Sequence, residues 1–165
     1  MERLWTPWRR AYLEGARSDG DSGEETCFLC AGPASTDDPE TLILFRATHV
    51  YVVLNRYPYN NGHLMVAPYQ HTGDFAALEA PTASELIAEA QRSVAILQQV
   101  YSPDAFNLGM NLGRVAGAGV PDHLHIHVVP RWNGDTNFMP VLAETKVLPE
   151  SLDQTYERLA RRFRE

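Results

Sequence analysis

Three histidines occupy alternate positions in a short apolar segment. They are His123, His125 and His127, separated by Leu124 and Ile126. Because alternate side chains of a β-strand point to the same face, this spacing predicts a strand with three imidazoles on one side, each about 6.6 Å from the next. Imidazole is both a nucleophile and a metal ligand, so the row indicates a catalytic or metal-binding site.

Two chemistries fit a row of imidazoles. Several histidines can hold a catalytic zinc ion, or one imidazole can attack an electrophile while its neighbours orient it and carry charge. Donors nearby favour attack on phosphorus, because Asn107 and Asn111 fall on one face of an alternating segment. Gly117 and Gly119 add a glycine-rich loop whose backbone N–H groups can cradle an oxyanion. Asp122 is the one carboxylate close to the row in the sequence.

A pair of cysteines, Cys27 and Cys30, lies between two polar segments, 18–25 and 31–40, that are expected to be loops. Their spacing fits a redox pair, two unpaired buried thiols, or half of a four-ligand zinc site. The chain contains no second Cys-x-x-Cys, so the spacing leaves these alternatives open. Two cysteines are too few for a disulfide-stapled scaffold.

The composition restricts which side chains can supply the catalytic groups. Lys146 is the only lysine among 14 basic residues, so Schiff-base chemistry is nearly excluded and cationic roles fall to arginine, histidine or a metal. The formal net charge of -7 argues against a sequence-independent nucleic-acid partner. No apolar run approaches the roughly 18 residues that cross a bilayer, and the first residues lack a signal peptide, so a cytoplasmic location without a membrane partner is expected.

The elements that must position these residues follow from the periodicity. Strands are predicted over 42–45, 49–55, 62–67, 106–112 and 123–129. Thr82 and Glu85 fit a capping box, and apolar residues at helical spacing then predict a helix to about Tyr101. An arginine-rich amphipathic helix is predicted over 149–165. Together they predict a single α+β domain over 1–165, with an antiparallel β-sheet, one long helix packed across it and a C-terminal helix.

The segment His123–Val129 resembles the signature of the histidine triad (HIT) superfamily of nucleotidyl hydrolases and transferases. Four further stretches resemble the same superfamily: Asn55–Pro58, Gly62–Pro68, Asn111–Gly113 and Pro130–Arg131. The resemblance therefore covers roughly residues 41–131. Leu4–Arg9 and Pro130–Phe138 are similar to the bacterial branch associated with diadenosine tetraphosphate phosphorylases.

The resemblance implies a role for each matching residue. His125 would attack the α-phosphorus of a nucleotide and become nucleotidyl-histidine, which divides one difficult displacement into two easier ones. His127 would bond a phosphate or bridging oxygen, and His63 would support the catalytic strand from a neighbouring strand. Asn55 would hold the ribose, and Asn111 the phosphate or the leaving group.

The phosphate site would be completed by backbone and guanidinium groups. Many members of the superfamily carry a serine or threonine shortly before the first histidine. Residues 119–122 contain no hydroxyl, so backbone donors of Gly117 and Gly119 must take its place. Arg131 is the favoured arginine for a forked contact with phosphate.

The resemblance also bears on the cysteines. Relatives with this cysteine pair complete a zinc site with a histidine after the Gly-His strand and with the first triad histidine, which match His71 and His123. The implied cofactor is thus a structural zinc ion on Cys27, Cys30, His71 and His123. Such a closed set has no open position for water and would clamp the N-terminal segment to the catalytic strand.

The sequence thus predicts an enzyme that cleaves an adenine nucleotide polyphosphate, with diadenosine tetraphosphate as the favoured substrate and phosphate or water as the acceptor. The resemblance implies a homodimer. Two alternatives remain at this point. One is a metallohydrolase with zinc on His123, His125 and His127, and the other is a nucleotide-binding sensor or interaction module with negligible turnover.

Overall fold

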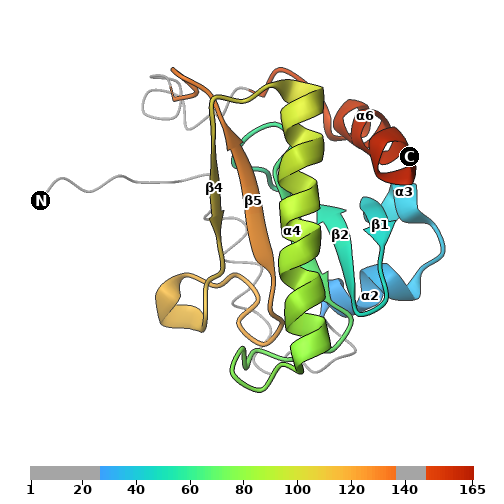
Figure 1. The fold of residues 1–165 in the computed structure, drawn as a ribbon, viewed down its shortest axis with the longest axis vertical. Helices are drawn as coiled ribbons and strands as arrows, with labels where there is room; N and C mark the ends of the chain where they lie inside the picture. The colour runs from blue at the N-terminus through green and yellow to red at the C-terminus, as the bar shows by residue number, and fades with distance from the viewer. Residues whose placement is uncertain (1–26, 137–147) are drawn as a thin grey trace, which may run out of the picture.

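The computed structural model describes residues 27–136 and 148–165. Its five strands form one sheet in the order β1-β2-β3-β5-β4, and every neighbouring pair is antiparallel. Figure 1 shows the long helix α4 lying along one face of this sheet, with α6 beside β1. The predicted α+β fold with one long helix across the sheet and a C-terminal helix is confirmed. The expected single domain also includes Leu4–Arg9 and the segment 18–25, which lie outside the described residues.

In the first half of the chain, the bounds of the strands differ only slightly from those expected. The strands are β1 (Ile43–Arg46), β2 (Val50–Leu54), β3 (Leu64–Pro68), β4 (Ala105–Gly109) and β5 (Ile126–Arg131). The helices are α2 (Phe28–Ala34), α3 (Asp38–Thr41), α4 (Ala80–Tyr101) and α6 (Leu152–Arg164), and a 3-10 turn, η2, spans Arg114–Ala116. The last strand begins later than predicted, which changes how the histidines are placed.

The core lies between α4 and the central strands. Every residue of β2 and β3 is buried, as expected of strands covered on both faces, and α4 buries Leu86 and Leu97 against them. Gly62, just before β3, has a φ of 73°, and a Cβ built there would lie 2.9 Å from Cδ2 of Leu97. Glycine is therefore favoured here, because another residue would be strained at this φ and would crowd the Leu97 side chain of α4.

The segment 31–40, expected to be a loop, is largely helical. α2 contains Gly32 and Pro33, which have low helix propensity, and this explains why the sequence did not indicate a helix. Asp37 caps α3 by accepting a hydrogen bond from the backbone N–H of Glu40, and Pro39 stands in the first turn. Asp37 and Pro39 together are a helix-start signal that the sequence does carry.

The predicted capping box at the start of the long helix is wrong. α4 begins at Ala80 with Glu79 as its N-cap residue, and no side chain caps it. The Glu85 carboxylate instead accepts hydrogen bonds from three successive backbone N–H groups, those of Thr48 (3.3 Å), His49 (2.5 Å) and Val50 (3.1 Å). Glu85 therefore ties α4 to the β1–β2 connection.

The C-terminal helix is held to the rest of the domain by a stacked guanidinium. Arg92 of α4 lies 4.1 Å from the ring centroid of Phe45 and 5.4 Å from that of Phe163, and it donates to the carbonyl of Phe163 at 2.8 Å. Ser151 and Gln154 form a capping box at the start of α6. The helix predicted over 149–165 is thus packed on β1 and α4 of its own chain.

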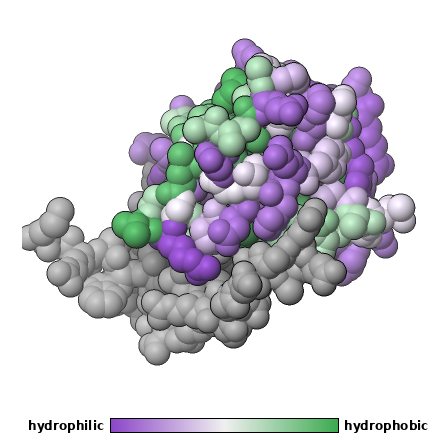
Figure 2. Space-filling model, turned by 90° about the horizontal axis from the view of Figure 1, so that it is seen from below, coloured by the Kyte–Doolittle hydropathy of each residue, from purple (hydrophilic) through white to green (hydrophobic). Residues whose placement is uncertain are grey.

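Among the described residues, no helix has both the length and the apolarity needed to cross a bilayer. The view from below in Figure 2 shows the described surface as mainly hydrophilic, with a smaller hydrophobic area along one edge. This agrees with the absence of a long apolar run from the sequence.

We predict that Glu85→Ala lowers the free energy of unfolding by about 1–2 kcal/mol, because three backbone N–H groups lose their acceptor. The pKa of Glu85 is lowered; burial opposes this shift, and the hydrogen bonds from His49, Thr48 and Val50 outweigh it. A carboxylate whose pKa is lowered by folding stabilises the fold at pH values above the ordinary carboxyl pKa. That stabilisation is lost as the pH falls through the lowered pKa. Urea unfolding of wild type and Glu85→Ala should therefore converge between neutral and strongly acidic pH. A difference that stays constant over that range would contradict the assignment.

Candidate active site

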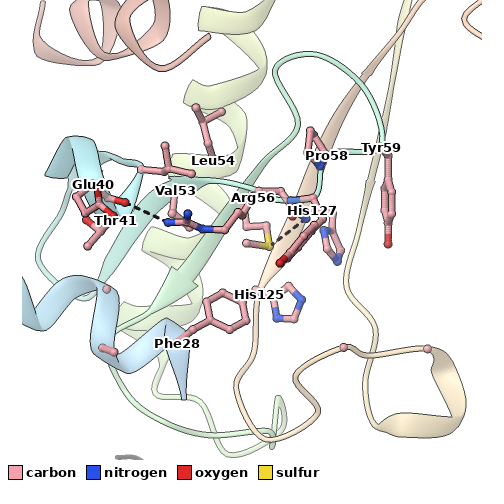
Figure 3. Close-up of a pocket in the computed structure, with 18 residues that line it drawn as sticks. Phe28, Glu40, Thr41, Val53, Leu54, Arg56, Pro58, Tyr59, His125 and His127 are labelled. Carbon is pink, nitrogen blue, oxygen red and sulfur yellow. Dashed lines mark hydrogen bonds between the residues drawn. The ribbon is translucent and has the colours of Figure 1, made fainter. Parts of the chain in front are cut away.

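A cavity of about 710 Å³ opens on the face of the sheet opposite α4. Its walls come from α2, α3, the C-terminal end of β2, the 55–59 loop and the glycine-rich loop before β5. Figure 3 shows His125 and His127 side by side in this cavity, with Phe28 of α2 beside His125 and Arg56 extending toward Glu40. The volume falls within the range of about 300–1,000 Å³ that small-ligand sites occupy.

The predicted row of three imidazoles on one strand is wrong in its geometry. β5 begins at Ile126, so His123 and His125 precede the strand and only His127 lies on it. The backbone N–H of Leu124 donates to the carbonyl of Thr72 at 2.8 Å, outside the sheet ladder. The three side chains are consequently divided between two sites: His125 and His127 line the cavity, and His123 is fully buried elsewhere.

His125 is held in one tautomer. Its Nδ1 lies 2.9 Å from the carbonyl oxygen of His123, and since a carbonyl can only accept, Nδ1 carries the hydrogen. Nε2 then keeps its lone pair, which makes it a nucleophile. Burial lowers the pKa of His125, and the hydrogen bond to the His123 carbonyl opposes this shift only in part. The imidazole is thus neutral and nucleophilic at neutral pH.

His127 is held in the opposite tautomer by a chain of hydrogen bonds. The backbone N–H of Tyr59 donates to Nδ1 of His63 at 3.0 Å, so the hydrogen of His63 is on Nε2. Nε2 of His63 lies 3.0 Å from Nδ1 of His127 and donates to it. The remaining hydrogen of His127 is therefore on Nε2, where it can be donated to an oxygen in the cavity. His63 supports His127 directly from the residue preceding β3.

Four side chains of the types that bind soft metals converge at a point outside the lining of the cavity. One ligand atom from each of Cys27, Cys30, His71 and His123 lies within 4.8 Å of the others. Nδ1 of His123 is 3.4 Å from both sulfur atoms, and Nδ1 of His71 is 3.3 Å from Sγ of Cys30. Ligand atoms in a tetrahedral site with bonds of about 2.0–2.3 Å lie about 3.3–3.8 Å apart, so these residues fit a zinc-type metal. The cluster is the expected set of four.

Contacts around the four ligands orient them. Nε2 of His123 donates to the carbonyl of Pro68 at 2.8 Å, which leaves Nδ1 as the ligand atom and fixes the ring. The buried hydroxyl of Tyr51 donates to the carbonyl of Leu29, between the cysteines, at 2.6 Å. Burial, followed by the neighbouring thiols, raises the pKa of Tyr51, so its hydroxyl keeps its proton and the bond persists. Among the described residues, the one cluster suited to a metal is therefore separate from His125 and His127.

The residues expected to bind nucleotide divide between two cavities. Asn55, Gly117 and Gly119 line the first. Asn111 and Arg131 line a second cavity of about 460 Å³ on the β4 side, which adjoins the first at His127. The side chain of Asn55 accepts from the backbone N–H of Tyr57 at 2.9 Å, which fixes its amide at the cavity wall.

Three of the expected phosphate contacts have other partners in this conformation. Nδ2 of Asn111 donates to the carbonyl of Gly117 at 3.3 Å. The backbone N–H of Gly117 donates to the carbonyl of Arg114, so the bare donor expected there is already used. Arg131 pairs with Asp135 through Nε (2.5 Å) and its terminal nitrogen (2.8 Å), and donates to Oδ1 of Asn107 at 2.6 Å. The hydrogen bonds to the Asp135 carboxylate raise the pKa of Arg131, so the guanidinium stays charged.

With this geometry in view, comparison with known proteins places the chain. The HIT domain model matches residues 37–134. This chain belongs to the HIT domain family. It is 41% identical over 162 residues to a Mycobacterium tuberculosis protein (strain CDC 1551 / Oshkosh) named AP-4-A phosphorylase, a match that covers 97% of this chain and 83% of that protein.

Two further HIT proteins extend the likeness. The Arabidopsis thaliana protein named bifunctional bis(5'-adenosyl)-triphosphatase/adenylylsulfatase FHIT is 31% identical over 147 residues, which are 85% of this chain and 79% of that protein. Among solved structures, a zinc-bound histidine triad family protein from Mycobacterium smegmatis has a TM-score of 0.68 at 24% identity and covers 86% of this chain and 96% of its own. At that identity the likeness shows the fold.

Several residues that shape this HIT domain site carry no motif that would single them out. A Cβ built on Gly73 would lie 2.5 Å from the carbonyl oxygen of Pro121, so glycine is needed where the loops bearing His71 and His123 meet. Asp135 could be found only from its pairing with Arg131. Phe28 lies between the two cysteines and reaches the cavity because α2 turns it toward His125.

Proposed function

We propose that this HIT protein cleaves an adenine nucleotide polyphosphate at its α-phosphorus, with His125 as the nucleophile and diadenosine tetraphosphate as the favoured substrate. The observation that carries the proposal is the hydrogen bond from Nδ1 of His125 to the carbonyl of His123, which leaves Nε2 as a neutral nucleophile at the cavity wall. The name of the Mycobacterium tuberculosis relative, AP-4-A phosphorylase, supports the choice of substrate.

The first step forms a bond from Nε2 of His125 to the α-phosphorus and breaks the bond from that phosphorus to the bridging oxygen. His127 donates its Nε2 proton to that oxygen, and ATP departs from diadenosine tetraphosphate. The hydrogen bond from His63 keeps His127 in the donor tautomer. In the second step phosphate or water attacks the adenylyl group and gives a proton to Nε2 of His127, which restores its donor tautomer. The P–N bond breaks, ADP or AMP forms, and Nε2 of His125 regains its lone pair.

The remaining contacts of the substrate follow from the lining of the cavities. Asn55 holds the ribose, and apolar side chains of the first cavity, among them Phe28 and Leu54, pack against the base. Gly119 contributes backbone to the phosphate site, Gly117 shapes the loop there, and Asn111 lies toward the leaving group.

Of the two alternatives, the sensor differs only in turnover, whereas the metallohydrolase requires His123, His125 and His127 to share a zinc ion. Both ring nitrogens of His123 face other partners, the thiols on one side and the Pro68 carbonyl on the other. This observation favours imidazole attack over metal-assisted hydrolysis.

Turnover of diadenosine tetraphosphate tests the function. We expect wild-type protein to produce ATP, with ADP when phosphate is added and AMP when water is the acceptor. His125→Asn should lose at least about 10³-fold in kcat, because the nucleophile is absent. Arg161→Met, a change on the exposed side of α6, is the control. Absence of product from wild-type protein would favour the sensor, and normal turnover by His125→Asn would refute the mechanism.

We further propose that Cys27, Cys30, His71 and His123 bind zinc, whose chemistry in such a closed site is structural. The purified protein should contain about one zinc ion per chain, and Cys30→Ser should lose the metal and unfold at a lower temperature. His125→Asn should keep the metal, as measured by atomic emission. Loss of zinc from His125→Asn with retention in Cys30→Ser would instead place the metal on the histidine row.

We also propose that two chains pair along β4. β4 is the last strand in the sheet order, and Leu108 on it is 54% exposed. A second copy would satisfy the outer backbone groups of this edge and cover Leu108. Light scattering should give a dimer mass for wild-type protein and a monomer mass for Leu108→Glu. Ile87→Glu, which changes an equally exposed apolar residue on α4, should remain dimeric; a monomeric wild type would contradict the proposal.

A further inference from the structure

The second cavity shares a wall with the proposed catalytic cavity. Its volume is about 460 Å³, and both cavities are lined by Pro58, Tyr59 and His127. His127 therefore lies at the boundary between them, whereas His125 lines only the first. A group that leaves the phosphorus away from the nucleophile, and takes a proton from His127, would leave toward the second cavity.

The two cavities differ in chemistry. The first is walled largely by apolar residues such as Leu42, Val53 and Met65, which suit a nucleoside. The second has polar side chains, with Asn107 and Asn111 from the β4 segment and Arg131 from β5. These groups offer hydrogen-bond donors, as a phosphate chain requires.

Arg131 is preorganised as a cation on this wall. Its side chain is 40% exposed, whereas that of Asp135 is 7% exposed, so the carboxylate lies behind the guanidinium. Asp135 accepts from Nε and one terminal nitrogen, and Asn107 accepts from the other, so each terminal nitrogen keeps a further N–H. Asn60 donates to Asp135 at 2.8 Å and fixes the carboxylate in turn.

The hydrogen bond from Arg131 also fixes the orientation of the Asn107 side chain. Because its Oδ1 accepts from Arg131 at 2.6 Å, its Nδ2 group is left to donate to another acceptor. The side chain lines the second cavity, so a ligand in that cavity can reach it.

From these contacts we infer that the second cavity binds the departing nucleoside polyphosphate, with Asn107 and the braced Arg131 as its phosphate contacts. The inference rests on the proposed function and specifies how the enzyme distinguishes dinucleoside polyphosphates from small adenylyl esters. The adenylyl half occupies the cavity of His125. The polyphosphate chain passes His127, where its bridging oxygen takes the proton, and extends along β4.

Asn107→Asp tests the inference, because it is isosteric and keeps an oxygen that accepts from Arg131, but places a negative charge where the polyphosphate would lie. Two substrates are compared, diadenosine tetraphosphate and the p-nitrophenyl ester of AMP, which present the same adenylyl group with different leaving groups. We expect kcat/KM for diadenosine tetraphosphate to fall about tenfold or more relative to that for the ester, and the loss to shrink at high salt. Gln99→Glu, the same amide-to-carboxylate change on the exposed side of α4, should not alter the ratio.

The outcomes separate the inference from the proposed function. If wild-type protein turns over neither substrate, the proposed function fails. Wild-type protein that turns over both substrates leaves three outcomes that overturn the inference. In these, Asn107→Asp lowers kcat/KM equally for both substrates, lowers it for neither, or causes a selective loss that salt does not reduce. In each case the second cavity is not the polyphosphate subsite. The melting temperature and mass of Asn107→Asp are measured alongside, so that a folding or assembly defect is recognised by its equal effect on both substrates.

Discussion

The site depends on the contacts of one buried residue, His123. Its Nδ1 faces both thiols, its Nε2 donates to the Pro68 carbonyl at the end of β3, and its own carbonyl accepts from Nδ1 of His125. A fully buried imidazole is stable only when its polar atoms have partners, so these contacts fix both ring and backbone. The orientation of His125 is therefore coupled to the cysteine cluster through a single residue.

The same cluster shapes the other side of the cavity. Cys27 is the N-cap residue of α2 and Cys30 lies in its first turn, and Phe28, Ala31 and Gly32 of that helix line the first cavity. α2 has seven residues and contains proline, so it has little stability of its own. Tertiary contacts, including the Tyr51 hydroxyl on the Leu29 carbonyl, hold it in place. The four-residue cluster thus bears on both the orientation of His125 and the cavity wall formed by α2.

The net charge of -7 is consistent with binding a polyanion because the donors are local. Broad electrostatic attraction is absent, but individual groups are oriented by their neighbours: His127 by His63, and Arg131 by Asp135 and Asn107. Each such group is held in its hydrogen-bonding geometry before substrate arrives, which reduces the ordering cost on binding.

By itself, the sequence determined which residues are available for chemistry and most of the helices and strands that position them. Alternation and helical spacing predicted the sheet, the long helix and the C-terminal helix, because local periodicity reflects which face is buried. The spacing of the histidines indicated a catalytic or metal-binding row, and the resemblance that includes this row implied the role of His125 and the set of four metal-type ligands. The capping box predicted at Glu85 was wrong for a reason that the local pattern does not contain. In the folded chain the Glu85 carboxylate accepts from three backbone N–H groups that are distant in sequence.

Only the tertiary structure decided what each histidine does. Leu124 bonds to Thr72 rather than to the sheet, so the row is broken and His123 turns to the cysteines while His125 faces the cavity. The tautomers of His125 and His127 follow from acceptors and donors at Tyr59, His63 and His123, which come from separate parts of the fold. The hydrogen-bond partners of an imidazole decide which ring nitrogen carries the proton. Most of those partners are neighbours in space rather than in sequence.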